Sequence, residues 1–348
     1  MPAVADVLVM PWQGMLLSSV LAFIVGFAIQ RGSLCCVVAA RQIVEHRRWH
    51  RPKAFLLVAC WSAVVVLPLS WLWPEQVQLS AGYPVGAQTI AAASVYGVGA
   101  YLNNACVFGT LSGLTRGEFG YLATIAGMIA GAVLSLAIQP NEVNGMVMTA
   151  SPLTEPALPG FLLWMLAFVL VVRAVYRHYR ASRNFAGPWR ELVTAAHWRP
   201  APAMAVLGVA GGLLYATAGE WTYLAVLSDR SAGLVGAGSA NVGPGAMIVC
   251  AALVSGGILS ARLAGRFAWQ RAARGMLPRR FVGGAFMSGA AAILPGGNDA
   301  LLLYGLPSGV LYAFVGYTVM ILSLCALLQA MRWVQSRLIR PAAAGTGR

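Results

Sequence analysis

The sequence predicts an all-α polytopic membrane protein. Of its 348 residues, 59% are hydrophobic and 10% are charged, and the mean hydropathy is +0.72; soluble domains carry about 25% charged residues. The apolar residues form segments of about 20, the length that crosses a bilayer. The net charge of +14 comes largely from arginines in the short loops between these segments, which indicates cytoplasmic loops rather than binding to nucleic acid.

Nine segments are predicted as transmembrane spans. They are residues 12–29, 54–73, 85–103, 119–139, 160–177, 203–220, 244–261, 280–296 and 309–331. The loops between them alternate in charge: 46–53 is basic, whereas 74–84 and 138–159 contain neither Lys nor Arg. Because basic loops stay in the cytoplasm, the pattern predicts a multi-pass protein of a bacterial cytoplasmic (inner) membrane, with its N-terminus outside and its C-terminus in the cytoplasm.

Four further segments are too short to span the bilayer. They are about 33–45, 104–117, 221–235 and 297–307, and each follows a span directly and contains small or polar residues. The alternation of loop charge holds only if each segment returns to the side from which it came. We therefore predict four re-entrant half-helices, which are tolerated at membrane depth only where protein or water shields their backbone.

A weak internal repeat relates the two halves of the chain. An offset of 192 residues pairs Gly97 with Gly289 and Gly113 with Gly305, and it places Cys106 opposite Asn298. An odd number of crossings separates the two units, so the repeat is predicted to be inverted, with its site at the interface near the midplane. The expected organisation is one integral membrane domain of residues 1–348. Its units, about 10–140 and 203–331, are joined by the span 160–177 and a basic cytoplasmic loop, 178–202.

The first span runs into a polar break. Gln30 and Arg31 follow the apolar run, and the thiols of Cys35 and Cys36 come directly after Gly32 and Ser33. Polar groups near the membrane interior are expensive and usually line a cavity or a pathway. Consecutive helical residues face about 100° apart, so only one of the two thiols is expected to face such a path well.

A second break surrounds Cys106, which follows Asn103, Asn104 and Ala105 and precedes Thr110. A buried thiol that only packs is the simpler interpretation. The polar residues around it favour a functional break, because the N-terminus of a half-helix directs unpaired N–H groups and a positive dipole end at whatever lies in front of it. The chemistry predicted here is therefore anion binding.

The counterpart in the second half is the segment from Leu294 to Asp299. Pro295 and two glycines end the span, and Asn298 or Asp299 could simply cap the next half-helix. A carboxylate would repel an anion, so we expect a structural role for Asp299 and a substrate contact for Asn298.

The other cysteines, Cys60, Cys250 and Cys325, lie within spans without polar neighbours and are predicted to pack in the core. The six cysteines have no metal spacing, and the sequence contains no nucleotide-binding glycine loop and no serine–histidine arrangement. We therefore expect no metal and no cofactor. An enzyme that uses a thiol is an alternative, but neither Cys35 nor Cys106 has a base close by in the sequence.

The run from Gly26-Phe27 through Gln30-Arg31-Gly32 to Cys35 resembles the opening motif of the YeeE/YedE membrane protein family, as do Cys106, Gly109 and Thr110 and the later run from Gly283-Gly284 to Tyr304-Gly305. The likeness covers most of the chain. It implies an hourglass-like fold of nine spans and short broken helices, uptake of thiosulfate or a related sulfur compound, and cysteines along a central path. Two positions depart from the family pattern: Asn298 replaces its third cysteine, and Gln42 replaces an acidic residue.

These observations together predict a transporter, not an enzyme, that takes up thiosulfate or a similar sulfur anion past Asn298, then Cys106 and Cys35. The candidate path residues are Gln30, Arg31, Cys35, Asn104, Cys106, Thr110 and Asn298, with Cys36 and Asp299 as further candidates. The expected partners are this anion and the lipid bilayer, and a cytoplasmic sulfur-carrier protein is a candidate. The alternatives are a sulfur-binding membrane sensor or assembly subunit without net transport, and a permease for another sulfur or selenium species.

Overall fold

The computed structural model describes residues 12–138, 148–182, 195–219, 221–234, 244–294 and 296–343, and within these ranges it contains helices and no strand. Its long helices are α1 (Trp12–Gly32), α3 (His50–Leu72), α4 (Ala87–Asn103), α6 (Tyr121–Ile138), α8 (Leu158–Ser182), α10 (Pro200–Ala218), α12 (Pro244–Leu263), α13 (Met276–Ile293) and α15 (Leu311–Ala343). The short ones are α2 (Cys36–His46), α5 (Val107–Thr115), α11 (Tyr223–Leu234) and α14 (Gly297–Ala300), which continues into the π-helical turn η2 (Leu301–Gly305).

The prediction of an all-helical membrane protein is confirmed. Each predicted span coincides with one long helix, and each predicted half-helix coincides with a short one. Within the described ranges, seven stretches are long and apolar enough to cross a membrane, and α4 and α13 are not among them. Helix α4 has only 17 residues, and α13 carries Arg279 and Arg280 in its first turns. The count of nine crossings therefore stays a prediction.

The order of the elements repeats along the chain. From α1 to α6 the lengths run long, short, long, long, short, long, and α10 to α15 follow the same order. The helix contacts repeat as well: α1 packs on α12 as α10 packs on α3, and α6 packs on α13 as α15 packs on α4. The central pairs, α1 with α10 and α4 with α13, join equivalent helices of the two halves. Each half therefore completes its packing against the other half.

Small residues allow the helices at the centre to approach closely. Gly127 on α6 faces the backbone of Phe281 on α13, and Gly284 on α13 faces the backbone of Thr124 on α6, so that a methyl group at either glycine would collide with the main chain. Close backbone approach through small residues is the usual way in which membrane helices associate. The α6–α13 pair is thereby fixed tightly beside the broken segments.

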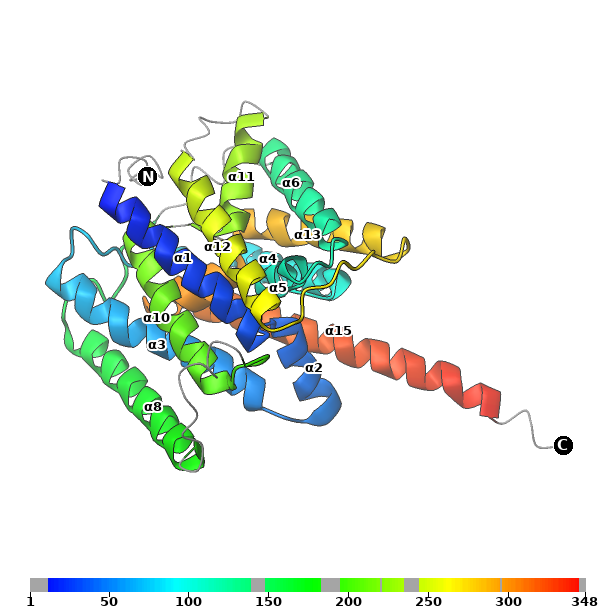
Figure 1. The fold of residues 1–348 in the computed structure, drawn as a ribbon, viewed down its shortest axis with the longest axis horizontal. Coiled ribbons are helices and arrows are strands. Elements are labelled where there is room, and N and C mark those ends of the chain that lie inside the picture. Colours follow the sequence, from blue (N-terminus) through cyan, green and yellow to red (C-terminus); the bar gives the residue numbers. More distant parts are fainter. Residues whose placement is uncertain are drawn as a thin grey trace.

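Figure 1 shows α4 and α5 in the middle of the bundle, α8 at one edge, and α15 extending beyond the other helices toward the C-terminus. Helix α8 packs mainly on α3 and exposes apolar side chains such as Leu162 and Leu166. The central segments are buried instead: Cys36, Cys106 and Asn298 have no exposed surface. This distribution suits a bundle whose outer face meets lipid and whose polar groups lie inside.

Candidate functional site

The thiols of Cys35 and Cys106 meet where two half-helices begin. Cys35 is the N-cap residue of α2 and Cys106 is the N-cap residue of α5, both with extended backbone. Their Sγ atoms lie 3.8 Å apart, close enough for a weak hydrogen bond between the thiols. Both cysteines are unoxidised and buried, with 7% and 0% of their surface exposed. Residues 71 positions apart in the sequence are thus placed together.

Cys36 reaches the sulfur of Cys106 with both its backbone and its thiol, since the thiols of Cys36 and Cys106 also interact. Its N–H group donates to the Sγ atom of Cys106 at 3.3 Å, so the first amide of α2 is directed at the sulfur at the start of α5. A glycine makes this approach possible: a methyl group on Gly109 would lie 2.7 Å from the Sγ atom of Cys35. The two half-helices therefore point backbone donors and thiols into one small buried region.

Asn103, which the sequence analysis did not select, holds the break between α4 and α5 together. Its Nδ2 atom donates to the carbonyl of Ala105 and to the Oγ1 atom of Thr110, both at 2.8 Å, and its Oδ1 atom accepts from Thr124 at 2.6 Å. Thr110, which was predicted as a path residue, thus helps to hold the break between α4 and α5 together, and it is fully buried. Asn104 instead is exposed, in the left-handed region with φ +61°, and bonded to Arg41. The structure does not bring Asn104 to the thiols.

Gln30 is joined to α5, whereas Arg31 is directed elsewhere. The Oε1 atom of Gln30 accepts from the hydroxyl of Ser112 at 2.6 Å, and its buried Nε2 atom has no partner among the described residues. The Arg31 guanidinium donates to the carbonyl of Ala195 and lies over the ring of Phe27. Gln30 therefore ties α1 to the half-helix that begins at Cys106, and Arg31 ties it to the segment before α10.

Asn298 lies at the start of α14 without capping it. The N-cap residue is Gly296, and no side chain caps the helix. Gly296 and Gly297 have φ angles of +90° and +65°, the left-handed region that glycine adopts without strain. The Oδ1 atom of Asn298 accepts from the hydroxyl of Tyr96 at 2.6 Å, and its fully buried Nδ2 group has no described partner. The amide therefore presents an unused donor in the interior.

Asp299 is also fully buried. The hydroxyl of Tyr215 on α10 donates to its Oδ2 atom at 3.3 Å, and the Tyr215 ring stacks on Tyr304 with their centroids 5.3 Å apart. No salt bridge to Asp299 is formed within the described part of the chain. Tyr96 and Tyr215, like Asn103, were not predicted, because an aromatic residue inside an apolar span has the sequence pattern of a packing residue.

The amide at Asn298 and the thiols belong to one continuous buried region. Helix α14 contacts α5, and α11 connects them: the hydroxyl of Tyr223 donates to the carbonyl of Val107 at 2.8 Å, and Leu224 faces Gly297. Because Val107 is the first residue of α5 after Cys106, the two breaks are separated by little more than these side chains.

A hollow of about 90 Å³ lies at the end of the molecule where α4 begins. Tyr83, Thr89, Leu294 and Tyr312 are among the residues that line it, and Leu294 is the C-cap residue of α13. The loop at this end is the one that lacks Lys and Arg. The carbonyl of Leu294 accepts from the N–H of Gly297 at 3.4 Å, so this part of the wall lies next to the start of α14.

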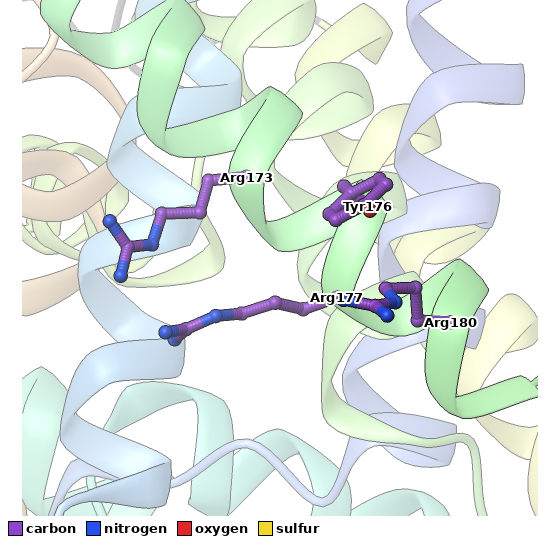
Figure 2. Close-up of a pocket in the computed structure, with 4 residues that line it drawn as sticks. All are labelled: Arg173, Tyr176, Arg177 and Arg180. Atoms are coloured by element: carbon purple, nitrogen blue, oxygen red, sulfur yellow. The ribbon is translucent and has the colours of Figure 1, made fainter.

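A larger hollow, about 660 Å³, lies on α8 and is lined by Arg173, Tyr176, Arg177 and Arg180. Figure 2 shows Arg173 and Arg177 extending in the same direction from successive turns of the helix. None of the predicted site residues lines this hollow. It is a basic surface feature, separate from the thiols and from Asn298.

Arginines surround the end of α1 near the thiols. The Arg266 side chain lies 3.2 Å from the Nδ1 atom of His197, and Arg51 donates to the carbonyl of Ser33. Partial desolvation and, next, the positive charge of Arg266 lower the pKa of His197, and Arg51 and Arg116 act in the same direction. This face is therefore electropositive, as expected of a cytoplasmic surface.

Within the described residues, no three His, Cys, Asp or Glu side chains are grouped so that they could hold a metal ion. The family model described as "Sulphur transport" matches residues 31–326, a range that includes Cys35, Cys106 and Asn298. A search of curated proteins found no match to the chain.

Proposed function

We propose that this chain, which belongs to the YeeE/YedE sulphur transport family, carries thiosulfate or a related small sulfur-containing anion across a bacterial cytoplasmic membrane into the cell. In this proposal the protein lies in the inner membrane, with its N-terminus outside and its C-terminus in the cytoplasm. The observation that carries it is the meeting of Cys35 and Cys106 at the N-termini of two buried half-helices, with their Sγ atoms 3.8 Å apart.

The proposed path begins in the hollow beside Leu294 and continues to Asn298, then to Cys106 and Cys35. The unpartnered Nδ2 group of Asn298 supports a first contact, because a buried donor without a protein acceptor is costly unless a ligand or water uses it. The contact between α14 and α5 supports direct passage to Cys106. Beyond the thiols, the arginines near His197 would attract an anion toward the cytoplasm.

The chemistry of these groups suits a soft anion. Thiols are weak hydrogen-bond donors with polarisable sulfur, so they can contact the terminal sulfur of thiosulfate without holding it tightly. The positive ends of α2 and α5 add stabilisation of negative charge without a fixed cation. A site of weak donors allows release as well as entry, which transport requires.

The repeated order of elements and their paired contacts support the inverted repeat, with units at about 10–140 and 203–331 in one membrane domain. In this proposal the half-helices of the first unit open inward and those of the second open outward. A cytoplasmic sulfur-carrier protein would meet the arginine-rich face near His197. The family is one of transporters, and no catalytic step is part of the proposal.

Uptake of labelled thiosulfate into bacterial cells that lack other thiosulfate importers tests the proposal. Cells with the wild-type protein in the membrane are expected to accumulate label above an empty-vector control. Cys106→Ala should remove this uptake, and Cys60→Ala, a thiol in the α3–α8 cluster, should retain it. Equal uptake with and without the protein would refute thiosulfate transport. Binding to purified protein without flux into liposomes would favour a sensor.

A further inference from the structure

Asp299 is a buried carboxyl group to which the proposed transport assigns no task. It has no exposed surface and follows directly after Asn298, the proposed first contact. Arg230, further along α11, is exposed and its guanidinium donates to the sulfur of Met247. The ionisable side chains near the carboxyl group are those of Tyr215 on α10, Tyr223 on α11, Tyr96 on α4, Tyr304 on η2 and Cys106 at the start of α5. None of these groups carries a positive charge, and within the described helices Asp299 forms no ion pair.

The groups around Asp299 can stabilise its charge while the site is empty. The Oδ2 atom accepts from the Tyr215 hydroxyl at 3.3 Å, and the hydroxyl of Thr222 and the backbone N–H groups of Asp299 and Ala300 lie near the carboxyl group. Its Oδ1 atom is buried and has no hydrogen-bond partner among the described residues. Hydrogen bonds to the charged form favour it, whereas burial without a cation disfavours it. The two effects oppose one another, so a further charge nearby decides between the ionised and the neutral carboxyl group.

A bound anion at Asn298 supplies that charge. Thiosulfate is a dianion throughout the neutral range, and it would lie next to a carboxylate in an interior of low dielectric. Two like charges at one site raise the proton affinity of the carboxyl group, and no described cation is close enough to offset the repulsion. The carboxyl group therefore has a reason to take up a proton when the anion arrives and to release it when the anion has passed.

We propose that Asp299 binds one proton together with the anion held at Asn298, so that this chain is a proton–anion symporter. This inference rests on the proposed function and adds its energy source. The proton comes from the outer side through the hollow beside Leu294, neutralises the carboxylate while the anion is bound, and leaves toward the cytoplasm after it. No bond to the anion is made or broken. One proton offsets one of the two charges of thiosulfate, so each cycle carries one net negative charge inward. A pH gradient that is acidic outside drives this uptake, whereas an interior-negative membrane potential opposes it.

Linkage fixes the sign of the pH dependence. If the empty site is ionised and the occupied site is protonated, binding takes up a proton and becomes tighter as the pH falls. Over the pH range in which Asp299 is ionised in the empty site and protonated in the occupied site, the dissociation constant for thiosulfate should decrease about tenfold for each unit by which the pH falls. A capping role for Asp299 predicts no such slope.

The experiment measures protons taken up when sodium thiosulfate is added to the purified protein in weakly buffered detergent solution with a pH indicator. The wild-type protein should take up about one proton for each bound anion, and Asp299→Asn should bind thiosulfate without taking one up. Glu155→Gln is the matched control, because it removes an exposed carboxyl group and should keep the wild-type stoichiometry.

The same proteins in liposomes give the second measurement. With the membrane potential held at zero, a pH gradient that is acidic outside should increase wild-type uptake of labelled thiosulfate, and a protonophore should abolish the increase. Asp299→Asn should show no increase. Uptake by the wild-type protein that ignores the gradient, or binding without proton uptake, would overturn the symport and leave the proposed function intact. An unchanged response in Asp299→Asn would overturn the role of this residue. Absence of both binding and flux would refute the proposed function and the symport with it.

Discussion

Replacing Asn298 by leucine removes the one side-chain amide at the start of α14 and puts an apolar group of similar size in its place. Two atoms matter here. The Oδ1 atom is the acceptor for the Tyr96 hydroxyl at 2.6 Å, and the Nδ2 group is a buried donor without a described partner. Leucine supplies neither atom, so both the fold around Tyr96 and the proposed contact with the anion should suffer.

The two losses differ in kind. A buried Tyr96 hydroxyl without an acceptor should lower the free energy of unfolding by about 1–3 kcal/mol. A lost donor to a charged ligand costs about 1.5–3 kcal/mol, and since about 1.4 kcal/mol corresponds to a tenfold change, thiosulfate should bind roughly ten to one hundred and fifty times more weakly. Tyr96→Phe separates the loss of stability from the loss of anion binding, because it removes the hydroxyl and keeps the amide donor of Asn298. The affinity of this variant for thiosulfate should remain within a few-fold of wild type.

The assay is thiosulfate binding to purified protein together with uptake into cells, each corrected for the amount of protein in the membrane. Asn298→Cys restores the residue type of the family and should keep or broaden activity toward thiosulfate. Asn298→Asp places a carboxylate on the proposed anion path and should abolish uptake. Wild-type uptake by Asn298→Asp would refute the reasoning, since a second carboxyl group beside Asp299 would have to take up a second proton before the anion could bind.

Three further predictions concern the thiols and the breaks that hold them. Cys35→Ala and Cys106→Ala should each strongly reduce uptake while the protein still inserts into the membrane. Alanine at Cys60, Cys250 or Cys325 should change uptake little. Equal loss of uptake in all five variants would mean that the thiols of Cys35 and Cys106 are structural. Gly109→Ala places a methyl group 2.7 Å from the Sγ atom of Cys35 and should reduce uptake several-fold, while Gly275→Ala, which meets nothing within 4 Å, should not. Asn103→Ala removes three buried hydrogen bonds and should destabilise the protein by roughly 2–4 kcal/mol, measured as thermal unfolding in detergent; an unchanged melting temperature would contradict this.

The helices could be predicted because their signal is local. Apolar runs of the length of a bilayer mark the long helices, and glycines with polar residues mark the points where they break. The offset of 192 residues predicts the same helices independently. When 192 is added to the bounds of α3, 50–72 becomes 242–264, and α12 occupies 244–263. Helix α4 shows the limit of this signal, since its 17 residues leave the number of crossings open.

The side-chain contacts of the candidate site could not be predicted in the same way. Asn103 and Asn104 are adjacent and chemically identical, yet one is buried with three hydrogen bonds and the other is exposed. The left-handed backbone at Asn104 decides between them, because it turns the chain just after Asn103. Either asparagine could have adopted that conformation, so only the packing of α4 on α13 and of α5 on its neighbours selects one.

Tyr96 gives a physical reason for an asparagine at position 298, where the family resemblance implies a cysteine. A buried tyrosine hydroxyl needs an acceptor, and the carbonyl oxygen of an amide is a much better one than a cysteine sulfur. Asn298 satisfies Tyr96 with its oxygen and still presents its NH₂ group to the interior, whereas a thiol at this position would offer a weak sulfur acceptor to Tyr96 and a weak S–H donor to the interior. The hydrogen bond from the Tyr96 hydroxyl on α4 therefore holds the amide of Asn298 in place on α14, and this amide is a harder donor than a thiol. Because a harder donor favours oxygen over sulfur, the chain is expected to meet the oxygen end of thiosulfate at Asn298 and its sulfur end only at Cys106 and Cys35.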